Sequence, residues 1–596
     1  MRQRTNALTV CAALAALAVQ PALACTNFLI TPGASADGST MITYTADSHE
    51  LYGELYFWPA AKHAPGAKRD IYEWDTGKYL GQIAEAPETY TVVGNMNEHQ
   101  VAVGETTFGG REELRDPEGI VDYGSLMYIA LQRAKSAREA IRVMTEVVAE
   151  YGYASTGESF SISDPKEAWI LEMIGKGPGR KGAVWVARKI PDGYVSGHAN
   201  ASRIRQFPLD DKDTLYAPDV ISFAREKGWF DGRDADFSFA DTYAPVDFGS
   251  RRFCDARVWC MYHRTAPSQS IPTSWAEGRD AAAEPLALWI KPDRKLTLAD
   301  VQGLVRDHFE GTELDMTKDV GAGPYRKPYR WRPLTWKVDD VEYFNERAVS
   351  TQQTGFSFVA QSRSWLPNPI GGILWFGVDD TFSTVYFPMY VGATAVPSSF
   401  AVGTGSFHEV TWDSAFWVFN QVANFAYSRY SEMIVDIQKV QAELESRFRG
   451  EISDVDAAAL ALHAQSPRLA KDYLTKYSVA AGDEVVARWR ELSKDLLYKY
   501  LDGNLKDEHG HVQHPGYDEE WYRMVAAATG ERLKTTKLPA ELAAEREKQE
   551  KAARLRESLV LLLDARGKSP DPTRRAEIDA ESDPAKLERW LVEAAQ

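Results

Sequence analysis

The segment Ala22-Leu23-Ala24-Cys25-Thr26-Asn27-Phe28-Leu29-Ile30 contains the predicted end of a leader and the predicted start of the folded chain. Arg2 and Arg4 precede an apolar run over residues 7–19 that is too short to span a bilayer. Ala22 and Ala24 give the small-x-small pattern that signal peptidase cleaves. The pattern predicts a signal peptide over residues 1–24, a periplasmic or secreted protein, and Cys25 as the first residue of its mature form.

A cysteine that begins a chain carries its own base. A thiol has a pKa of about 8.5 and an α-amino group one of about 7.7–8.0, so near neutral pH the amine can accept the thiol proton. This is the N-terminal-nucleophile arrangement. The alternative is lipidation of Cys25, which would give a non-catalytic exported binding lipoprotein. Lipidation usually needs Leu three residues before the Cys, and Ala22 stands there.

The number of cysteines favours a reactive thiol. Of four cysteines, Cys11 would leave with the leader, while Cys254 and Cys260 lie six positions apart in an exported chain, where a disulfide is permitted. Cys25 is then the unpaired one, and an unpaired cysteine at a chain terminus is a candidate nucleophile.

The overall composition is that of a globular protein. The chain has 596 residues, 44% of them hydrophobic and 26% charged, which excludes a disordered chain and a polytopic membrane protein. A formal charge of −17 disfavours nucleic acid and anionic lipid as partners. We expect no membrane-spanning segment. The sequence leaves open whether the protein forms a homo-oligomer.

Several blocks follow Cys25 in a characteristic order. They are Cys25-Thr26-Asn27-Phe28-Leu29-Ile30, Ala34-Ser35-Ala36-Asp37-Gly38-Ser39-Thr40 with Asp47, Asn97-Glu98-His99-Gln100-Val101-Ala102-Val103, Ser196-Gly197-His198-Ala199-Asn200-Ala201-Ser202-Arg203-Ile204, Asn345-Glu346-Arg347-Ala348-Val349-Ser350 and Gly372-Ile373-Leu374-Trp375-Phe376-Gly377. In these blocks the chain resembles the cysteine N-terminal-nucleophile dipeptidases, the family of lactobacillal dipeptidase A and the secernins. The resemblance implies an α+β fold, an αββα sandwich of the N-terminal-nucleophile hydrolases, in which Cys25 attacks the carbonyl of a short peptide.

The resemblance also implies a set of catalytic residues. Related amidases have an Arg and an Asp three residues apart, then an Asn and a later Arg. Asp47 matches the Asp, with a role in orienting the Cys25 amine or holding a substrate amine, and Asn200 matches the oxyanion donor. For the later Arg both Arg252 and Arg257 lie at a suitable distance, and we favour Arg257 as catalytic.

The candidate substrate-binding residues are Tyr44, Asn97 and Arg252. Tyr44 stands where the related amidases have the first Arg, and a phenol at this position can still donate a hydrogen bond. We expect no metal and no cofactor, because the histidines show no metal-ligand spacing. An amidase of the same fold acting on acylated amino acids or conjugated amides remains the alternative enzyme.

Hydrophobic patterning predicts strands first and helices later. Strands are predicted over residues 26–31, 40–46, 90–94, 100–105, 159–163, 168–174, 184–187, 373–378 and 384–391, with two helical pieces between 123 and 151, the second capped by Ser136. His308 is predicted as a core residue on a helix that begins near Thr297. After about residue 409 helical periodicity dominates, including an apolar stripe of Val485, Val486, Trp489, Leu492, Leu496 and Leu497.

The predicted organisation is therefore a catalytic domain over 25–408, a helical region packed on it over 409–538, and a helical extension over 539–596. In the extension Pro539 suits the first helical position, Gly567 suits a helix end, and Asp583-Pro584 suits the start of a last helix.

Overall fold

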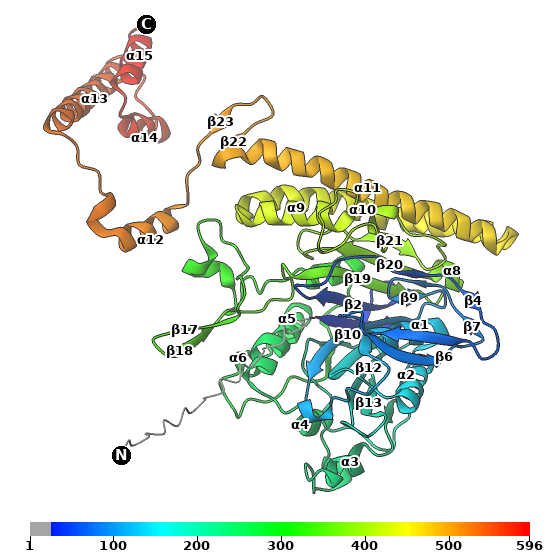
Figure 1. Cartoon of the computed structure of the whole chain (residues 1–596). Coiled ribbons are helices and arrows are strands. Elements are labelled where there is room, and N and C mark those ends of the chain that lie inside the picture. Colours follow the sequence, from blue (N-terminus) through cyan, green and yellow to red (C-terminus); the bar gives the residue numbers. More distant parts are fainter. Residues whose placement is uncertain (1–24) are drawn as a thin grey trace, which may run out of the picture. The chain divides into compact units, whose positions relative to one another are not determined.

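The computed structural model describes residues 25–596, and the predicted signal peptide lies outside the described residues. The chain divides into two compact units, the first ending at Gly516 and the second formed by Tyr517–Gln596 (Figure 1). Each is described by itself. The predicted boundaries at 408 and 538 differ from this division and remain predictions.

Two large antiparallel sheets form the centre of the first unit. The seven-stranded sheet has the order β16 (Trp289–Ile290), β14 (Val195–His198), β1 (Asn27–Ile30), β2 (Thr40–Asp47), β19 (Thr354–Ser362), β20 (Gly372–Val378) and β21 (Phe387–Tyr390). The eight-stranded sheet has the order β15 (Thr214–Tyr216), β13 (Ala183–Lys189), β12 (Ala168–Gly175), β11 (Gly157–Ser163), β10 (Ala102–Gly109), β9 (Met96–Asn97), β8 (Val92–Val93) and β3 (Phe57–Trp58).

The strand after Cys25 lies in the middle of the first sheet. β1 pairs with β2, with Leu29 opposite Ile42, and on its other side with β14, with Asn27 opposite His198. The predicted hairpin is thus present. Since β1 is central and fully buried, the backbone just before it is held from both sides.

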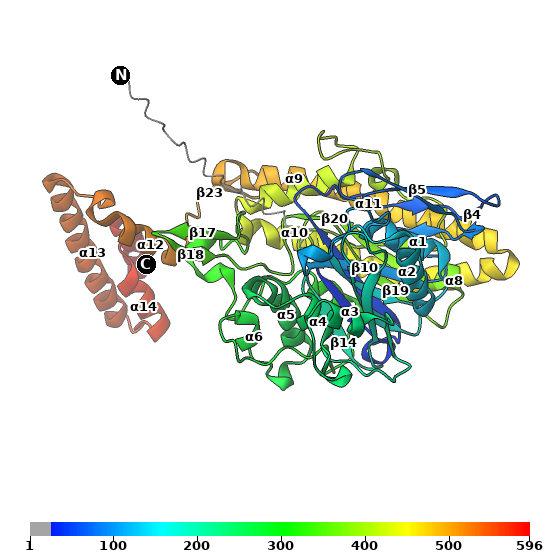
Figure 2. The same cartoon turned by 60° about the horizontal axis from the view of Figure 1, so that its bottom comes forward.

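The two sheets lie face to face and helices cover both outer faces (Figure 1, Figure 2). On the eight-stranded sheet, α1 (Tyr123–Arg133) and α2 (Ala137–Tyr151) pack against the outward side chains of β11, such as Phe160 and Ile162. Ser136 caps α2 as predicted, its side chain accepting from the backbone N–H of Glu139. The inner side of β11 carries Ser161, whose hydroxyl lies 2.8 Å from Nε2 of His198 in the other sheet.

Three helices cover the outer face of the seven-stranded sheet: α9 (Ala415–Tyr427), α10 (Tyr430–Gln465) and α11 (Pro467–Tyr500). The predicted helical region is confirmed, with a break at residues 428–429 between α9 and α10. Five members of the predicted α11 stripe are buried, but Leu497 is 55% exposed. Leu497 was wrongly included because one residue turns a helix by 100° and takes it off the buried face.

The remaining elements of the first unit connect the sheets and helices. They are β4 (Ala61–Lys62), β5 (Lys68–Tyr72), β6 (Tyr79–Ala84), β7 (Glu88–Thr89), α3 (Val220–Glu226), α4 (Phe239–Tyr243), the π-helical turn η4 (Ser250–Asp255), α5 (Ala256–Thr265), α6 (Ser274–Glu277), α7 (Leu298–Leu304), β17 (Thr335–Val338), β18 (Val341–Phe344), α8 (Asn368–Gly371), β22 (Leu505–Lys506) and β23 (Val512–Gln513). No helix within residues 25–596 is long and apolar enough to cross a membrane.

His308 is buried, as expected of a core histidine, but not on a helix. α7 starts after Thr297 with a capping box and ends at Leu304. His308 follows in an irregular segment, fully buried, with its Nδ1 3.0 Å from Oε1 of Glu310. The predicted helix was therefore too long.

The second unit is helical and has its own small core. It contains α12 (Glu519–Thr529), α13 (Pro539–Ala565), α14 (Pro572–Ala580) and α15 (Pro584–Ala595). Pro539 begins α13, and Gly567 follows its end with a φ of +68°, as the sequence predicts. Ala552, Leu559, Ile578 and Leu587 form a core from α13, α14 and α15.

Candidate active site

Cys25 lies immediately before β1 and is 4% exposed. Its Sγ is 3.6 Å from Oε1 of Glu105 on β10 and 3.8 Å from the hydroxyl of Tyr44 on β2. The Tyr44 hydroxyl in turn donates to Glu105 over 2.5 Å. Burial, and then the charges of Glu105 and Asp47, raise the pKa of the Cys25 thiol well above its usual range. The thiol is therefore neutral near pH 7, and a base must remove its proton during any attack.

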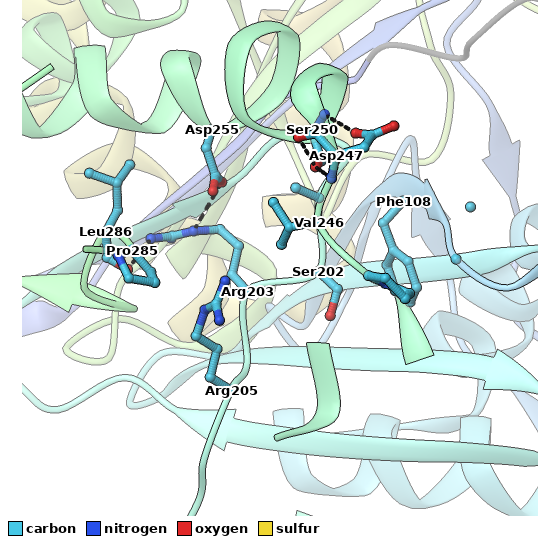
Figure 3. Close-up of a pocket in the computed structure, with 15 residues that line it drawn as sticks. Phe108, Ser202, Arg203, Arg205, Val246, Asp247, Ser250, Asp255, Pro285 and Leu286 are labelled. Carbon is cyan, nitrogen blue, oxygen red and sulfur yellow. Dashed lines mark hydrogen bonds and ion pairs between the residues drawn. The ribbon is translucent and has the colours of Figure 1, made fainter. Parts of the chain in front are cut away.

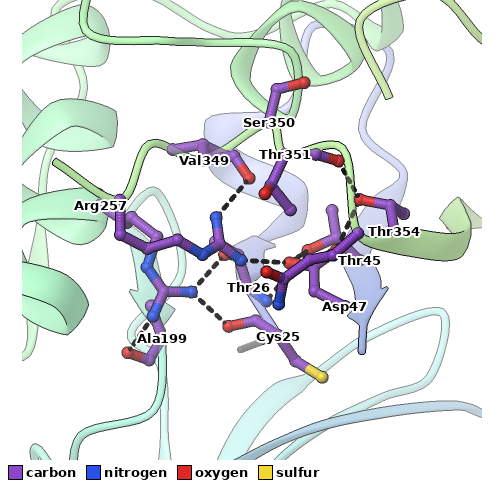
Figure 4. A network of polar contacts seen from close by, with 12 residues as sticks. Cys25, Thr26, Thr45, Asp47, Ala199, Arg257, Val349, Ser350, Thr351 and Thr354 are labelled. Atoms are coloured by element: carbon purple, nitrogen blue, oxygen red, sulfur yellow. Dashed lines mark hydrogen bonds and ion pairs between the residues drawn. The ribbon is translucent and has the colours of Figure 1, made fainter. Parts of the chain in front are cut away.

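Arg257 on α5 holds the backbone at Cys25 in place. Its Nη1 donates to the Cys25 carbonyl over 2.6 Å and to the Thr26 hydroxyl over 2.7 Å, and its Nη2 donates to the Ala199 carbonyl over 3.0 Å (Figure 4). Burial and the nearby Arg347 lower the pKa of Arg257 to about 10, so the guanidinium is charged at neutral pH. In Figure 4 the Cys25 sulfur points away from Arg257. The thiol is thus left on the side of Glu105 and Tyr44.

Asp47, at the end of β2, is fully buried and held by three donors. Nη2 of Arg347 donates to Oδ2 over 2.6 Å, and the hydroxyls of Thr45 and Thr354 donate to Oδ2 and Oδ1 over 2.9 and 2.7 Å. Burial raises the pKa of Asp47, and Arg347 and the two hydroxyls act against this rise. Arg347, 300 positions further along the chain, thus supplies the positive charge beside Asp47.

Asn200 follows β14 and touches the same network. Nη2 of Arg257 donates to its Oδ1 over 2.8 Å, and its Nδ2 donates to the Thr107 carbonyl over 2.8 Å. Its φ is +60°, a left-handed conformation that Asn tolerates better than most residues. The structure thus brings Cys25, Tyr44, Asp47, Asn200 and Arg257 together.

Two predicted substrate-binding residues lie elsewhere. Arg252, in the π-helical turn, pairs with Glu346, to which its Nε donates over 2.9 Å, so its guanidinium is held away from Cys25. The side chain of Asn97 is fully buried, donating to the carbonyls of Leu131 and Ala134. Asn97 thus holds α1 against β9, and its placement gives no support to a role in substrate binding.

Cys254 and Cys260 are free thiols, which corrects the expected disulfide. Both lie on the continuous helical segment formed by η4 and α5, where a separation of six residues turns the two side chains to different faces. The Cys260 thiol donates instead to Oδ1 of Asp307 over 3.0 Å.

A cavity of about 790 Å³ is lined by residues that contact the Cys25 network, although Cys25 itself is not in its wall. Arg257, Asn200 and Arg347 lie in its wall, so the network that holds Cys25 is one side of this cavity. The same wall also carries Glu158 and Asp75, so the cavity contains both positive and negative groups. Within residues 25–596, no three His, Cys, Asp or Glu side chains are placed to hold a metal ion.

A smaller cavity of about 260 Å³ adjoins the large one and shares Phe108 and Ser250 with it (Figure 3). Arg203 dominates its wall, with Nε 3.4 Å from Oδ1 of Asp255 and Nη2 donating to the Ala287 carbonyl over 2.6 Å. Because these bonds join the segment after β14 to the π-helical turn η4 and to the loop at Ala287, Arg203 is a structural residue here.

Glu105, Glu158 and Arg347 belong to the site but were not predicted. A signal existed for Glu105, because it is a carboxylate inside an otherwise uncharged strand, and such a residue is rarely buried without a reason. Arg347 lies in one of the blocks that carry the family resemblance. What the sequence lacks is the pairing of β10 with β11, which brings Glu105 near Glu158.

Comparison with known proteins identifies the family. A model described as "Peptidase family C69" matches residues 59–443, well over half of the chain. The chain belongs to peptidase family C69. Members of C69 are cysteine peptidases, so the protein is a peptide hydrolase. The matched residues include Glu105, Glu158, Asn200 and Arg257 but begin after Cys25.

Several curated relatives of this C69 peptidase are similar over most of their length. It is 26% identical to a "Probable dipeptidase" of Salmonella dublin over 64% of this chain and 84% of the relative. It is 24% identical to a "Probable dipeptidase" of Latilactobacillus sakei over 80% of this chain and 94% of the relative. A "Probable dipeptidase A" of Streptococcus pyogenes is 25% identical over 74% of this chain and 90% of its own.

Proposed function

We propose that the protein is an exported dipeptidase in which signal cleavage exposes Cys25 as an N-terminal nucleophile. The observation that carries the proposal is the position of Cys25 in this C69 peptidase: it is buried just before a central strand, and Arg257, which holds its carbonyl, lines a cavity of about 790 Å³. The two facing sheets with helices on both outer faces support the αββα sandwich of the N-terminal-nucleophile hydrolases. The predicted cleavage after Ala24 supports a location in the periplasm or outside the cell.

In the proposed reaction the α-amino group of Cys25 takes the thiol proton as sulfur attacks the peptide carbonyl. The amine then gives that proton to the leaving amino group, and water hydrolyses the resulting thioester. Asn200, positioned by Arg257 and Thr107, supplies a hydrogen-bond donor to the oxyanion, a contact typically worth about 2.7–4 kcal/mol of barrier. Asp47 and Arg257 orient the Cys25 backbone and its amine.

The cavity supports a substrate with both charges. A dipeptide is a zwitterion, and the cavity wall carries Glu158 and Asp75 as well as Arg332 and Arg347. The printed names of the relatives point to the same substrate class.

The proposal is tested with protein purified from the export compartment and a Cys25→Ala variant. We expect the wild type to hydrolyse unmodified dipeptides in preference to N-acyl amino acids, and the variant to fold but lose all hydrolysis. Preference for N-acyl amino acids would instead make the protein an amidase. Activity that survives the substitution would show that Cys25 is not the nucleophile.

A further inference from the structure

Two buried carboxyl groups lie side by side next to the thiol. Thr107 on β10 lies directly opposite Glu158 on β11, and Glu105 is two residues before Thr107 on the same strand. Glu105 and Glu158 therefore point to the same face of the sheet. Each side chain is 1% exposed. The Thr107 hydroxyl donates to Oε1 of Glu158 over 2.7 Å, but Oε2 of Glu105 and Oε2 of Glu158 receive no hydrogen bond within residues 25–596.

Such a pair is stable only with a proton or a cation between its members. Burial raises the pKa of Glu105 to about 7, and burial and Glu105 raise that of Glu158 well above its usual value. Two close carboxylates cannot both ionise at little cost unless a positive group compensates them. The arginines of the cavity wall have other partners. Arg257 contacts the Cys25 backbone, Arg347 contacts Asp47, Arg332 contacts Gln353 and Arg115 contacts Glu73.

The pair lies where the amine of a substrate must be. Glu158 lines the cavity, and Oε1 of Glu105 is 3.6 Å from the Cys25 sulfur. In a peptide cut after its first residue, the α-nitrogen is two bonds, or about 2.5 Å, from the carbonyl carbon. Sulfur approaches that carbon to about 3–3.5 Å before attack. Carboxylate oxygens placed this close to the sulfur are then within reach of the α-ammonium.

We propose that Glu105 and Glu158 form the subsite that binds the free α-ammonium of the peptide substrate, which restricts hydrolysis to the bond after the first residue. This inference rests on the proposed function. On binding, the ammonium compensates the charge of the pair in place of a proton carried by one of the two carboxyl groups, and that proton passes to solvent. Asp47, which the sequence offers as an amine holder, already has three donors and no further part in this step.

The test compares alanyl-alanine with N-acetyl-alanyl-alanine in the wild type, Glu158→Gln and Glu112→Gln. The wild type should prefer the free dipeptide by at least about 100-fold in kcat/KM, since a charge-assisted contact to a buried group is lost on acetylation. In Glu158→Gln that preference should fall to about tenfold or less, mainly through loss of activity on the free dipeptide. Glu112, an exposed glutamate of the same cavity, is the charge-matched control, and its variant should keep the full preference.

Thr107→Val provides a second variant, because it removes the hydroxyl that positions Glu158 but leaves both carboxyl groups. It should reduce the preference by a smaller factor. The rate at which iodoacetamide alkylates Cys25 is measured in each variant, and a rate equal to that of the wild type shows that the environment of the thiol is unchanged.

Equal losses of kcat/KM on both substrates in Glu158→Gln, or equal kcat/KM of the wild type on the free and the acetylated dipeptide, would overturn the inference. If Cys25→Ala remains active, the proposed function fails first, so the two failures are distinguishable.

Discussion

At the scale of single residues, the thiol of Cys25 is held neutral and its backbone is held rigid. Glu105 and Tyr44 face the sulfur, whereas Arg257 fixes the carbonyl on the other side. A positive group beside the sulfur would stabilise the thiolate. The Cys25 sulfur instead faces a carboxyl group and a phenol. Activation must therefore come from proton transfer during the attack, which is the role proposed for the α-amino group.

The pH dependence of dipeptide hydrolysis should follow the acidic pair. Below pH 7 Glu105, with its pKa of about 7, is protonated and binds an ammonium less well, so kcat/KM should rise as pH increases through about 7. It should fall again as the substrate amine, with a pKa of about 8, loses its proton. The profile is measured with alanyl-alanine between pH 5 and 9.5. A rate that falls steadily from pH 5 to 8 would contradict this assignment.

Arg257→Lys should impair both stability and catalysis. The guanidinium donates to the Cys25 carbonyl, the Thr26 hydroxyl and the Ala199 carbonyl, and a lysine cannot reproduce this fork. We expect a loss of about 3 kcal/mol in unfolding free energy and at least about a 100-fold drop in kcat/KM. Denaturant unfolding and dipeptide kinetics measure the two effects.

Arg252→Lys is the matched control, since Arg252 pairs with Glu346 and not with Cys25. It should lose stability but keep kcat. If both variants lose kcat equally, Arg257 has no special role at the nucleophile.

At the scale of elements, polar bonds join the two sheets next to β1, the strand that follows Cys25. Nδ1 of His198 on β14 lies 2.7 Å from the Thr106 hydroxyl on β10, and its Nε2 lies 2.8 Å from the Ser161 hydroxyl on β11. His198 is fully buried, and its environment excludes the charged form. Because β14 pairs with β1, this bridge fixes the distance between Cys25 and the acidic pair of the other sheet.

The bridge should make the protein less stable in acid. Burial and Arg203 lower the pKa of His198 to about 3, whereas the unfolded chain binds the proton below about 6.5. Between these values the unfolded state gains a proton that the native state lacks, so stability falls as pH falls. His198→Gln should show a pH slope of unfolding free energy between pH 6 and 4 that is smaller by up to about 1.4 kcal/mol per unit. Equal slopes in the two proteins would contradict a neutral buried His198.

At the scale of the whole molecule, the chain forms two compact units, and the second is a unit of its own. It has its own core of Ala552, Leu559, Ile578 and Leu587, and the family match ends at residue 443. Every side chain of the candidate site lies in the first unit.

Deletion of residues 517–596 should therefore leave dipeptide hydrolysis within about twofold of the full chain. The first unit keeps both sheets and the helices that cover them, including α11. Steady-state kinetics of the truncated protein against the full chain measures this. A loss of activity in a truncated protein that retains its circular dichroism spectrum would show that the second unit takes part in catalysis.

The sequence predicted the central elements well because their signals are local. Alternation and turn residues identified β1, β2 and β12, and Ser136 marked the start of α2. The placement of Asp47, Asn200 and Arg257 around Cys25 came from the family resemblance. Glu158 and Arg347 were missed, because strand pairing and the return of a distant loop bring them to the site, and no local pattern encodes those contacts.

The role of Cys25 as a free N-terminal nucleophile can be tested by measuring the mass of the N-terminal peptide of the active, exported protein. We expect a peptide that begins at Cys25 with an unmodified amine. Stoichiometric alkylation of that same thiol should abolish hydrolysis. An active protein that retains residues before Cys25, or that carries a lipid on its sulfur, would rule out this role.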